Sequence, residues 1–95
     1  MIIRAFRATP RPGCEAEYEL MIRGESTMLV LSQKGLVALY TGGRVEPGNE
    51  IVMVSVWEDE ESVAAFAGPQ WHSPVVLAGE EQLVLHTDVA NYSTW

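Results

Sequence analysis

The sequence predicts an α+β domain in which four antiparallel strands form one sheet and the helices lie on a single face of it. Apolar segments of strand length occur at 2–9, 36–41, 51–57 and 83–89. Segments with helical spacing or composition occupy 14–34 and 62–67, which gives the order strand, helix, strand, strand, helix, strand. With 95 residues, the chain is long enough for one such domain, and we expect it to span 1–95.

The first strand is expected to begin at Ile2 and to end before two prolines, because proline lacks the amide proton that a strand ladder needs. Alternation along the strand divides its side chains between two faces. One face holds Ile2, Arg4, Phe6 and Ala8, and the other holds Ile3, Ala5 and Arg7. Both faces mix apolar and charged groups, so the sequence leaves open which of them is buried.

The helical segment 14–34 has an apolar stripe at spacings of three and four, formed by Tyr18, Met21, Ile22 and Leu29. Its middle is weak, because Gly24 costs about 1 kcal/mol relative to alanine and Ser26 and Thr27 follow it. We therefore expect one bent helix or two consecutive helices. Gly35, directly after Lys34, is a suitable C-terminal cap.

The third strand, 51–57, is apolar on both faces except at Ser55, which predicts a central place in the sheet. The glycine- and proline-rich segment 42–50 before it reads as a long hairpin loop. The acidic run 58–61 after it invites a metal-site interpretation, but acids at a helix start cap free amide protons and complement the helix dipole. We interpret this run as a helix cap.

The end of the chain returns to the sheet. The segment 70–77 predicts a short turn or helix before the last strand, 83–89. Two aromatic residues in the tail 90–95, Tyr92 and Trp95, indicate that the tail docks, either on this chain or on a partner subunit, rather than frays.

This order of elements is the ferredoxin-like βαββαβ arrangement, with a four-stranded antiparallel sheet and both helices on one face. The other face carries apolar side chains that need a cover. We therefore expect a homodimer in which two sheets pack together as a dimeric α/β barrel.

Composition excludes several classes of function. Six basic and thirteen acidic residues give a formal charge of −7, which disfavours nucleic acid and anionic membranes as partners. The single cysteine, Cys14, cannot form an internal disulfide, and with no signal-like segment this predicts a cytoplasmic protein. The two histidines and one cysteine lack metal-ligand spacing, so no metal and no cofactor are expected.

The chain resembles the antibiotic biosynthesis monooxygenase family of dimeric α/β-barrel proteins. The resemblance is carried by the strand end 54–57, the acidic helix 58–68, the segment 71–76 (WHSPVV) and the aromatic-ended last strand 89–92. It covers nearly the whole chain and implies the same fold. The family includes cofactor-free oxygenases, heme-degrading oxygenases and many proteins of unknown activity.

The heme-degrading pattern does not match. It has an asparagine on the first strand, a tryptophan in the second helix and a histidine about ten residues later. Here the first strand has Arg7 and no asparagine, the helix has Phe66, and the later position is Val76. The resemblance therefore favours the cofactor-free branch, which oxidises phenolic or anthrone-type rings to quinones in an aromatic-lined pocket.

For that chemistry, the resemblance implies a site in which His72 accepts the phenolic proton and Arg7, or alternatively Arg44, holds the resulting anion. Arg4 and Arg7 face opposite sides of the strand, so at most one of them can enter a given pocket. The predicted substrate-binding residues are Trp57, Trp71, Tyr40 and Tyr18.

Purely structural interpretations of these residues stay open beside the catalytic one. His72 is also explained as a turn histidine, and the neighbouring glutamates disfavour a nucleophilic Cys14. The leading hypothesis is a cofactor-independent monooxygenase acting on a small aromatic or quinone-type compound. The alternatives are a non-catalytic protein of the same fold that binds a small ligand, and a structural dimer.

Overall fold

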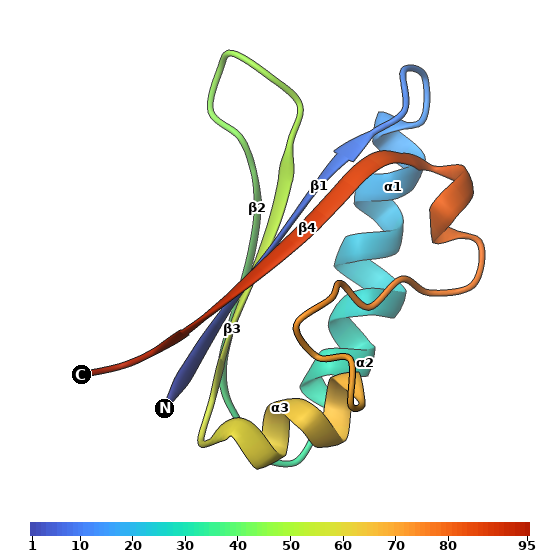
Figure 1. The fold of residues 1–95 in the computed structure, drawn as a ribbon. Helices are drawn as coiled ribbons and strands as arrows, with labels where there is room; N and C mark the ends of the chain where they lie inside the picture. The colour runs from blue at the N-terminus through green and yellow to red at the C-terminus, as the bar shows by residue number, and fades with distance from the viewer.

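The computed structural model describes residues 1–95, and its four strands form a single antiparallel sheet (Figure 1). The order across the sheet is β2-β3-β1-β4. The strands are β1 (Ile2–Pro10), β2 (Leu36–Gly43), β3 (Ile51–Trp57) and β4 (Val84–Ser93). This is the ferredoxin-like α+β arrangement, so the predicted fold class is confirmed.

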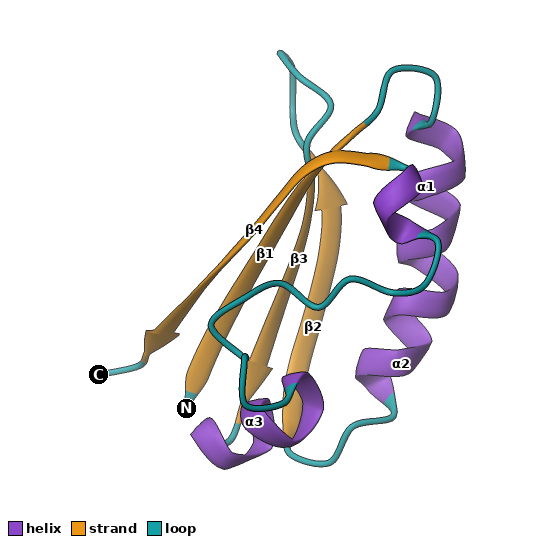
Figure 2. Cartoon of the chain, turned by 45° about the vertical axis from the view of Figure 1, so that its right-hand side comes forward, coloured by secondary structure: helices purple, strands orange, loops and turns teal.

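The helices cover one face of the sheet and leave the other open (Figures 1 and 2). One continuous helical run consists of α1 (Glu15–Met21), the π-helical turn η1 (Ile22–Ser26) and α2 (Thr27–Leu31). The second helix, α3 (Glu60–Ala67), follows β3 directly. A segment without regular structure leads from α3 to the short 3₁₀ turn η2 (Glu80–Gln82) and into β4.

Alternation along β1 decides which side chains face the helices. Ile2, Arg4 and Ala8 are buried on the helix side, whereas Arg7 is exposed on the other side. The same alternation in β3 buries Met53, Ser55 and Trp57. The sequence did not decide which face of β1 is buried. In the structure it is the face of the even-numbered residues.

The helical run changes from α- to π-helical geometry where the sequence predicted a weak point. The turn η1 contains Gly24 and Ser26, and the Thr27 hydroxyl donates a hydrogen bond to the Ile22 carbonyl at 2.6 Å. Such a bond competes with regular helix hydrogen bonds, because serine and threonine side chains can serve carbonyls of the preceding turn. The run therefore stays continuous and widens into one π-helical turn.

The acidic run after β3 caps α3. The Asp59 carboxylate accepts hydrogen bonds from the Ser62 amide at 2.8 Å and the Ser62 hydroxyl at 2.7 Å. These bonds stabilise the charged carboxylate and lower the pKa of Asp59. Glu60 and Glu61 lie in the first turn, where their charges complement the helix dipole.

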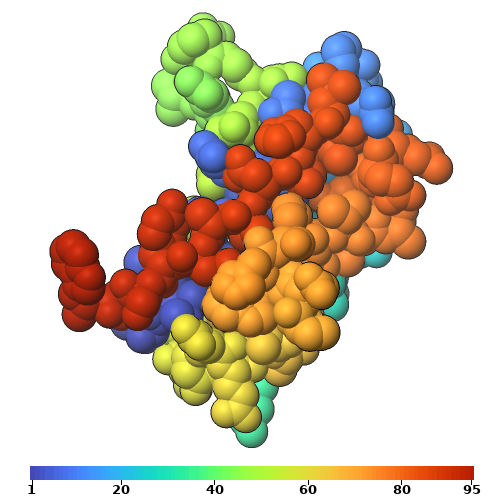
Figure 3. All heavy atoms as spheres, viewed as in Figure 1, coloured from blue at the N-terminus to red at the C-terminus, as the bar shows by residue number.

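One segment differs from the sequence-based expectation. The last strand does not stop at residue 89, because β4 pairs with β1 from Val84 opposite Pro10 to Ser93 opposite Ile2, with a register shift between Thr9 and Pro10. The segment 70–77 contains a turn over 70–72 and no helix, which is one of the two predicted alternatives. The loop after β2 (green) and the end of the chain (dark red) project from the body of the protein (Figure 3).

The core lies between the sheet and the helices and centres on Trp57, Tyr18 and Val63, which are fully buried. The Trp57 indole donates a hydrogen bond to the Ser55 hydroxyl at 2.8 Å, so its polar atom is satisfied inside the core. Trp57 also stacks on Phe66 of α3 with 5.2 Å between the ring centroids. Aromatic packing therefore holds α3 against the end of β3.

We expect Gly35→Ala to destabilise the protein by about 2–4 kcal/mol. Gly35 has a φ of +89°, and a Cβ atom there would meet the Ser62 side chain at 2.1 Å, far inside contact distance. The matched control is Gly24→Ala, where a Cβ atom has open space, and this variant should gain up to about 1 kcal/mol. Urea denaturation measures both, and equal effects of the two substitutions would contradict the argument.

Candidate functional site

A cavity lies between the inner face of the sheet and the helical run. Its volume is about 40 Å³, and about 500 Å³ when all the space between atoms and the open solvent at its mouth are counted. Eight of its twelve lining residues are hydrophobic. The lining residues are Arg4, Phe6, Ile22, Ser26, Leu29, Val30, Met53, Ser55, Phe66, Val75, Leu77 and Glu80.

The sheet side of the cavity carries a buried arginine. Arg4 is 4% exposed, and its guanidinium donates hydrogen bonds to the backbone carbonyls of Trp71 and Ser73, at 2.5 and 3.1 Å, and to the Asn91 side-chain oxygen at 3.2 Å. All three acceptors are neutral. Burial lowers the pKa of the Arg4 guanidinium, because the charged form is costly away from water. Arg4 therefore tethers the segment after α3 to the sheet and places a positive charge at the cavity wall.

The helical side of the cavity is built by the π-helical turn. Ile22 and Ser26, four residues apart, both line the cavity and are both buried. The Ser26 hydroxyl has no hydrogen-bond partner, and it is the one buried side-chain polar atom in that state. Because buried polar groups are normally satisfied, this hydroxyl marks a place where a polar group of a ligand or a water fits.

The far wall contributes a buried carboxylate. Glu80 is 2% exposed, and its two oxygens accept hydrogen bonds from the Tyr18 hydroxyl at 2.6 Å and the Leu77 amide at 2.9 Å. Burial and then the contact with Glu80 raise the pKa of Tyr18, because both disfavour the tyrosinate. Tyr18 thus stays protonated and holds Glu80 in place.

Of the six residues that the sequence predicted for a site, three support the cavity from behind its wall. Trp57 bonds Ser55 and stacks on Phe66, and Tyr18 bonds Glu80. Trp71, half-buried, accepts the Arg4 hydrogen bond through its carbonyl. None of the three is itself a lining residue.

The predicted proton acceptor, His72, is exposed and stacks on Trp71 with 3.9 Å between ring centroids. It does not line the cavity either. Its role therefore stays a prediction, and it would need a substrate that extends to the segment around residue 72.

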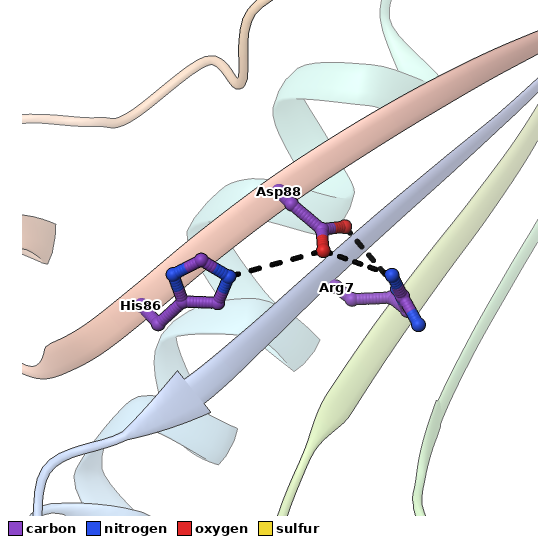
Figure 4. A network of polar contacts seen from close by, with 3 residues as sticks. All are labelled: Arg7, His86 and Asp88. Atoms are coloured by element: carbon purple, nitrogen blue, oxygen red, sulfur yellow. Dashed lines mark hydrogen bonds and ion pairs between the residues drawn. The ribbon is translucent and has the colours of Figure 1, made fainter.

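Arg7 and Tyr40 lie on the opposite face of the sheet. Arg7 forms a bidentate pair with Asp88, with nitrogen–oxygen distances of 2.9 and 3.2 Å, and His86 lies 3.9 Å from the same carboxylate (Figure 4). The hydrogen bond and charge of Asp88 raise the pKa of Arg7. Tyr40 is 67% exposed on the neighbouring part of this face. The structure does not bring these two residues together with the other four.

Sequence reasoning missed Arg4, Ser26 and Glu80. Alternation had already shown that either Arg4 or Arg7, not both, can enter a pocket. Ser26 was not part of the predicted apolar stripe. A serine in such a segment indicates a weak helix as readily as a ligand contact, so the sequence did not single it out. Glu80 gave no local signal, since its partner Tyr18 lies 62 residues away.

A four-stranded antiparallel sheet with helices on one face, and a mostly apolar cavity between them, defines a small ferredoxin-like α+β domain. The family model for antibiotic biosynthesis monooxygenases matches residues 1–72. The chain belongs to the antibiotic biosynthesis monooxygenase family. None of the curated proteins compared with it matches its sequence.

Solved structures share the fold over almost the entire chain. A candidate antibiotic biosynthesis monooxygenase from Deinococcus radiodurans superposes with a TM-score of 0.82 at 9% identity, covering 100% of this chain and 93% of the other. SnoaB from Streptomyces nogalater, a cofactor-independent oxygenase, gives 0.75 at 15% identity, covering 99% and 92%. Rv0793 from Mycobacterium tuberculosis gives 0.78 at 14% identity, covering 99% and 94%. At these identities the likeness establishes the fold alone.

No helix of this protein combines the length and the hydrophobicity that crossing a membrane requires.

We expect Tyr18→Phe to cost about 1–3 kcal/mol, because the buried Glu80 carboxylate loses one of its two donors. The raised pKa of Tyr18 also has a pH signature. Its contribution to stability is complete below the unfolded-state pKa of about 10 and is lost as pH rises through the higher folded-state pKa.

Urea denaturation at neutral pH measures the first effect, and alkaline titration followed by tyrosinate absorbance measures the second. One tyrosine of the wild type should ionise only together with unfolding, and this step should be missing in Tyr18→Phe. Tyr92→Phe, on an exposed side chain, is the control and should keep both the stability and the step. A Tyr18→Phe protein with wild-type stability would show that the Glu80 pair is not stabilising.

Proposed function

We propose that the protein is a cofactor-independent monooxygenase that oxidises a small aromatic compound to a quinone-type product. The observation that carries the proposal is the cavity, which combines apolar walls with four buried polar side chains, Arg4, Ser26, Ser55 and Glu80. Pockets for small organic ligands have this composition. Family membership and the likeness to SnoaB support the reaction class.

The chemistry needs no electron donor besides the substrate. When a phenolic or enolised ring loses a proton, the resulting anion is electron-rich and passes an electron to O₂. Combination of the two radicals bonds one oxygen atom to a ring carbon, and the second oxygen atom leaves as water when the carbonyl forms. A ring CH₂ and O₂ thus become a carbonyl and water. The protein has to hold the ring, accept the proton and stabilise the anion.

Two groups are available for the proton. His72 is the acceptor we predict from the sequence, because histidine is the residue type that most often accepts a proton near neutral pH. Glu80 is the carboxylate on the cavity wall itself. Trp57, Tyr18 and Trp71 serve the site in this proposal through the wall residues that they hold, namely Phe66, Glu80 and Arg4.

A second candidate function is binding of a small ligand without turnover. It is favoured by the engagement of Glu80, whose two oxygens already accept hydrogen bonds, and by the exposure of His72. A protein with no free proton acceptor at the cavity would hold an aromatic ligand without ionising it.

We expect the purified protein to consume O₂ when it is mixed with hydroquinones or hydroxyanthrones, and His72→Ala to reduce the rate by about 10²-fold or more with intact folding. The measurement is oxygen uptake together with product absorbance. Glu80→Gln, which keeps the shape of the side chain, is the parallel variant for the other acceptor. Loss of turnover in one variant only assigns the proton to that residue.

Ligand-dependent tryptophan quenching without O₂ uptake above background across the panel would refute the oxygenase and favour the binding protein. Unchanged turnover in His72→Ala would end the role of His72.

We further propose that the protein is a homodimer in which the open sheet faces of two copies pack together. The residues that point to this face include Ile3, Ala5, Val52, Val54, Val56, Ala38, Tyr40, Ala90 and Tyr92. Apolar side chains concentrated on one uncovered sheet face are typical of an interface. In such a dimer Arg7, Asp88 and His86 form a charged cluster at one end of the face.

We expect Val54→Asp to convert the dimer to a monomer, because it places a charge at the centre of the apolar face. Val45→Asp is the matched control, since Val45 is 88% exposed in the loop after β2. Sedimentation at micromolar concentration measures the state of each protein. A wild type that sediments as a monomer would refute the dimer.

A further inference from the structure

The Arg4 guanidinium is a buried charge without a counter-charge. It is 4% exposed, and none of the ion pairs in the protein includes it. Its partners are two carbonyls and one amide oxygen, which use only part of its five donor positions. Burial of an unpaired charge is costly, and proteins usually pair such groups. An anion bound in the cavity would supply the counter-charge that Arg4 lacks.

Two hydroxyl groups at the same cavity add donors for that anion. Ser26 is buried and its Oγ has no partner. Ser55, opposite Arg4 in the neighbouring strand, accepts from the Trp57 indole, so its own O–H proton remains free to donate. The arginine and the two serines come from β1, η1 and β3, and all three line the cavity. Together they form a part of the cavity wall that is rich in hydrogen-bond donors.

The cavity has an acceptor as well, the Glu80 carboxylate, which would repel an anion placed beside it. Glu80 is not within ion-pair distance of Arg4, and hydrogen bonds from Tyr18 and Leu77 occupy its oxygens. Burial lowers the pKa of Arg4 with no carboxylate acting in the opposite direction. Arg4, Ser26 and Ser55 therefore form a group of donors that does not include Glu80, and an anion is expected beside them rather than beside the carboxylate.

We propose that the cavity binds a small aromatic ligand through one anionic oxygen, a phenolate or a carboxylate, that pairs with Arg4 and accepts the free hydroxyl proton of Ser26. This deepens the proposed function and rests on the same cavity. Apolar wall residues such as Phe6, Phe66 and Leu29 contact the ring. The role of anion stabiliser, which the sequence suggested for Arg7, falls to the arginine on the cavity side of the same strand.

The test is isothermal titration calorimetry with matched pairs of ligands. Benzoate against benzamide probes a carboxylate, and 4-nitrophenolate against 4-nitroanisole, in alkaline buffer, probes a phenolate. We expect at least one anion to bind about tenfold or more tightly than its neutral analogue, because only the anion forms charge-assisted hydrogen bonds with the donors of the protein. The neutral analogue offers an amide group or an ether oxygen in its place. The pair that shows the preference identifies the source of the anion.

Variants assign the preference to residues. Arg4→Gln should abolish it, and Ser26→Ala should reduce anion affinity about three- to tenfold while neutral ligands bind as before. Ser26→Ala breaks no hydrogen bond of the free protein, so it should fold even if Arg4→Gln does not. Ser32→Ala, an exposed serine at the end of the same helical run, is the control and should bind like the wild type.

Equal affinity for the anion and the neutral analogue in both pairs, or no measurable binding of either anion, would overturn the proposal. A preference that survives in Ser26→Ala at full size, or one lost in Arg7→Gln and kept in Arg4→Gln, would overturn it as well. Benzoate is bound without being oxidised, so this outcome does not depend on oxygen uptake. Anion binding without turnover would reject the oxygenase alone, and turnover without anion preference would reject this inference alone.

Discussion

The cavity exists because one buried guanidinium ties an irregular segment to the sheet. Arg4 reaches from β1 to the carbonyls of Trp71 and Ser73 and also to Asn91 of β4. The segment after α3 has no regular structure of its own, and its backbone oxygens need donors. Arg4 supplies them at a point where Val75 and Leu77, a few residues on, come to line the cavity.

The opposite wall shows how a local irregularity in a helix can serve a site. The π-helical turn contributes Ile22 and Ser26 to the cavity wall, and residues four positions apart lie on one face of a helix. π-Helical turns are costly and occur often at functional sites. The combination of a π-turn with an orphaned buried hydroxyl is stronger evidence for a site than either feature alone.

The parts of this protein that were predictable from sequence are those set by local periodicity. Strand β3 spans 51–57 as predicted, and the acidic run caps α3 through Asp59. The extent of β4 was underestimated, because its last residues are strand only through pairing with β1. The cavity lining depends on contacts between distant residues. Glu80 is held at the cavity wall by a hydrogen bond from Tyr18. The two residues are 62 positions apart, so no local sequence pattern indicates the pair.

Arg4 and Arg7 on β1 are an example of what local sequence patterns cannot decide. Period-two alternation proves that Arg4 and Arg7 serve different faces, yet each face of β1 carries both apolar and charged residues, so alternation cannot rank them. The decision comes from β4, which places Asp88 opposite Arg7 and Asn91 opposite Arg4. A carboxylate neutralises one guanidinium, and a neutral amide leaves the other charged. The same strand pairing thus makes one arginine a surface ion pair and leaves the other as the positive charge inside a cavity.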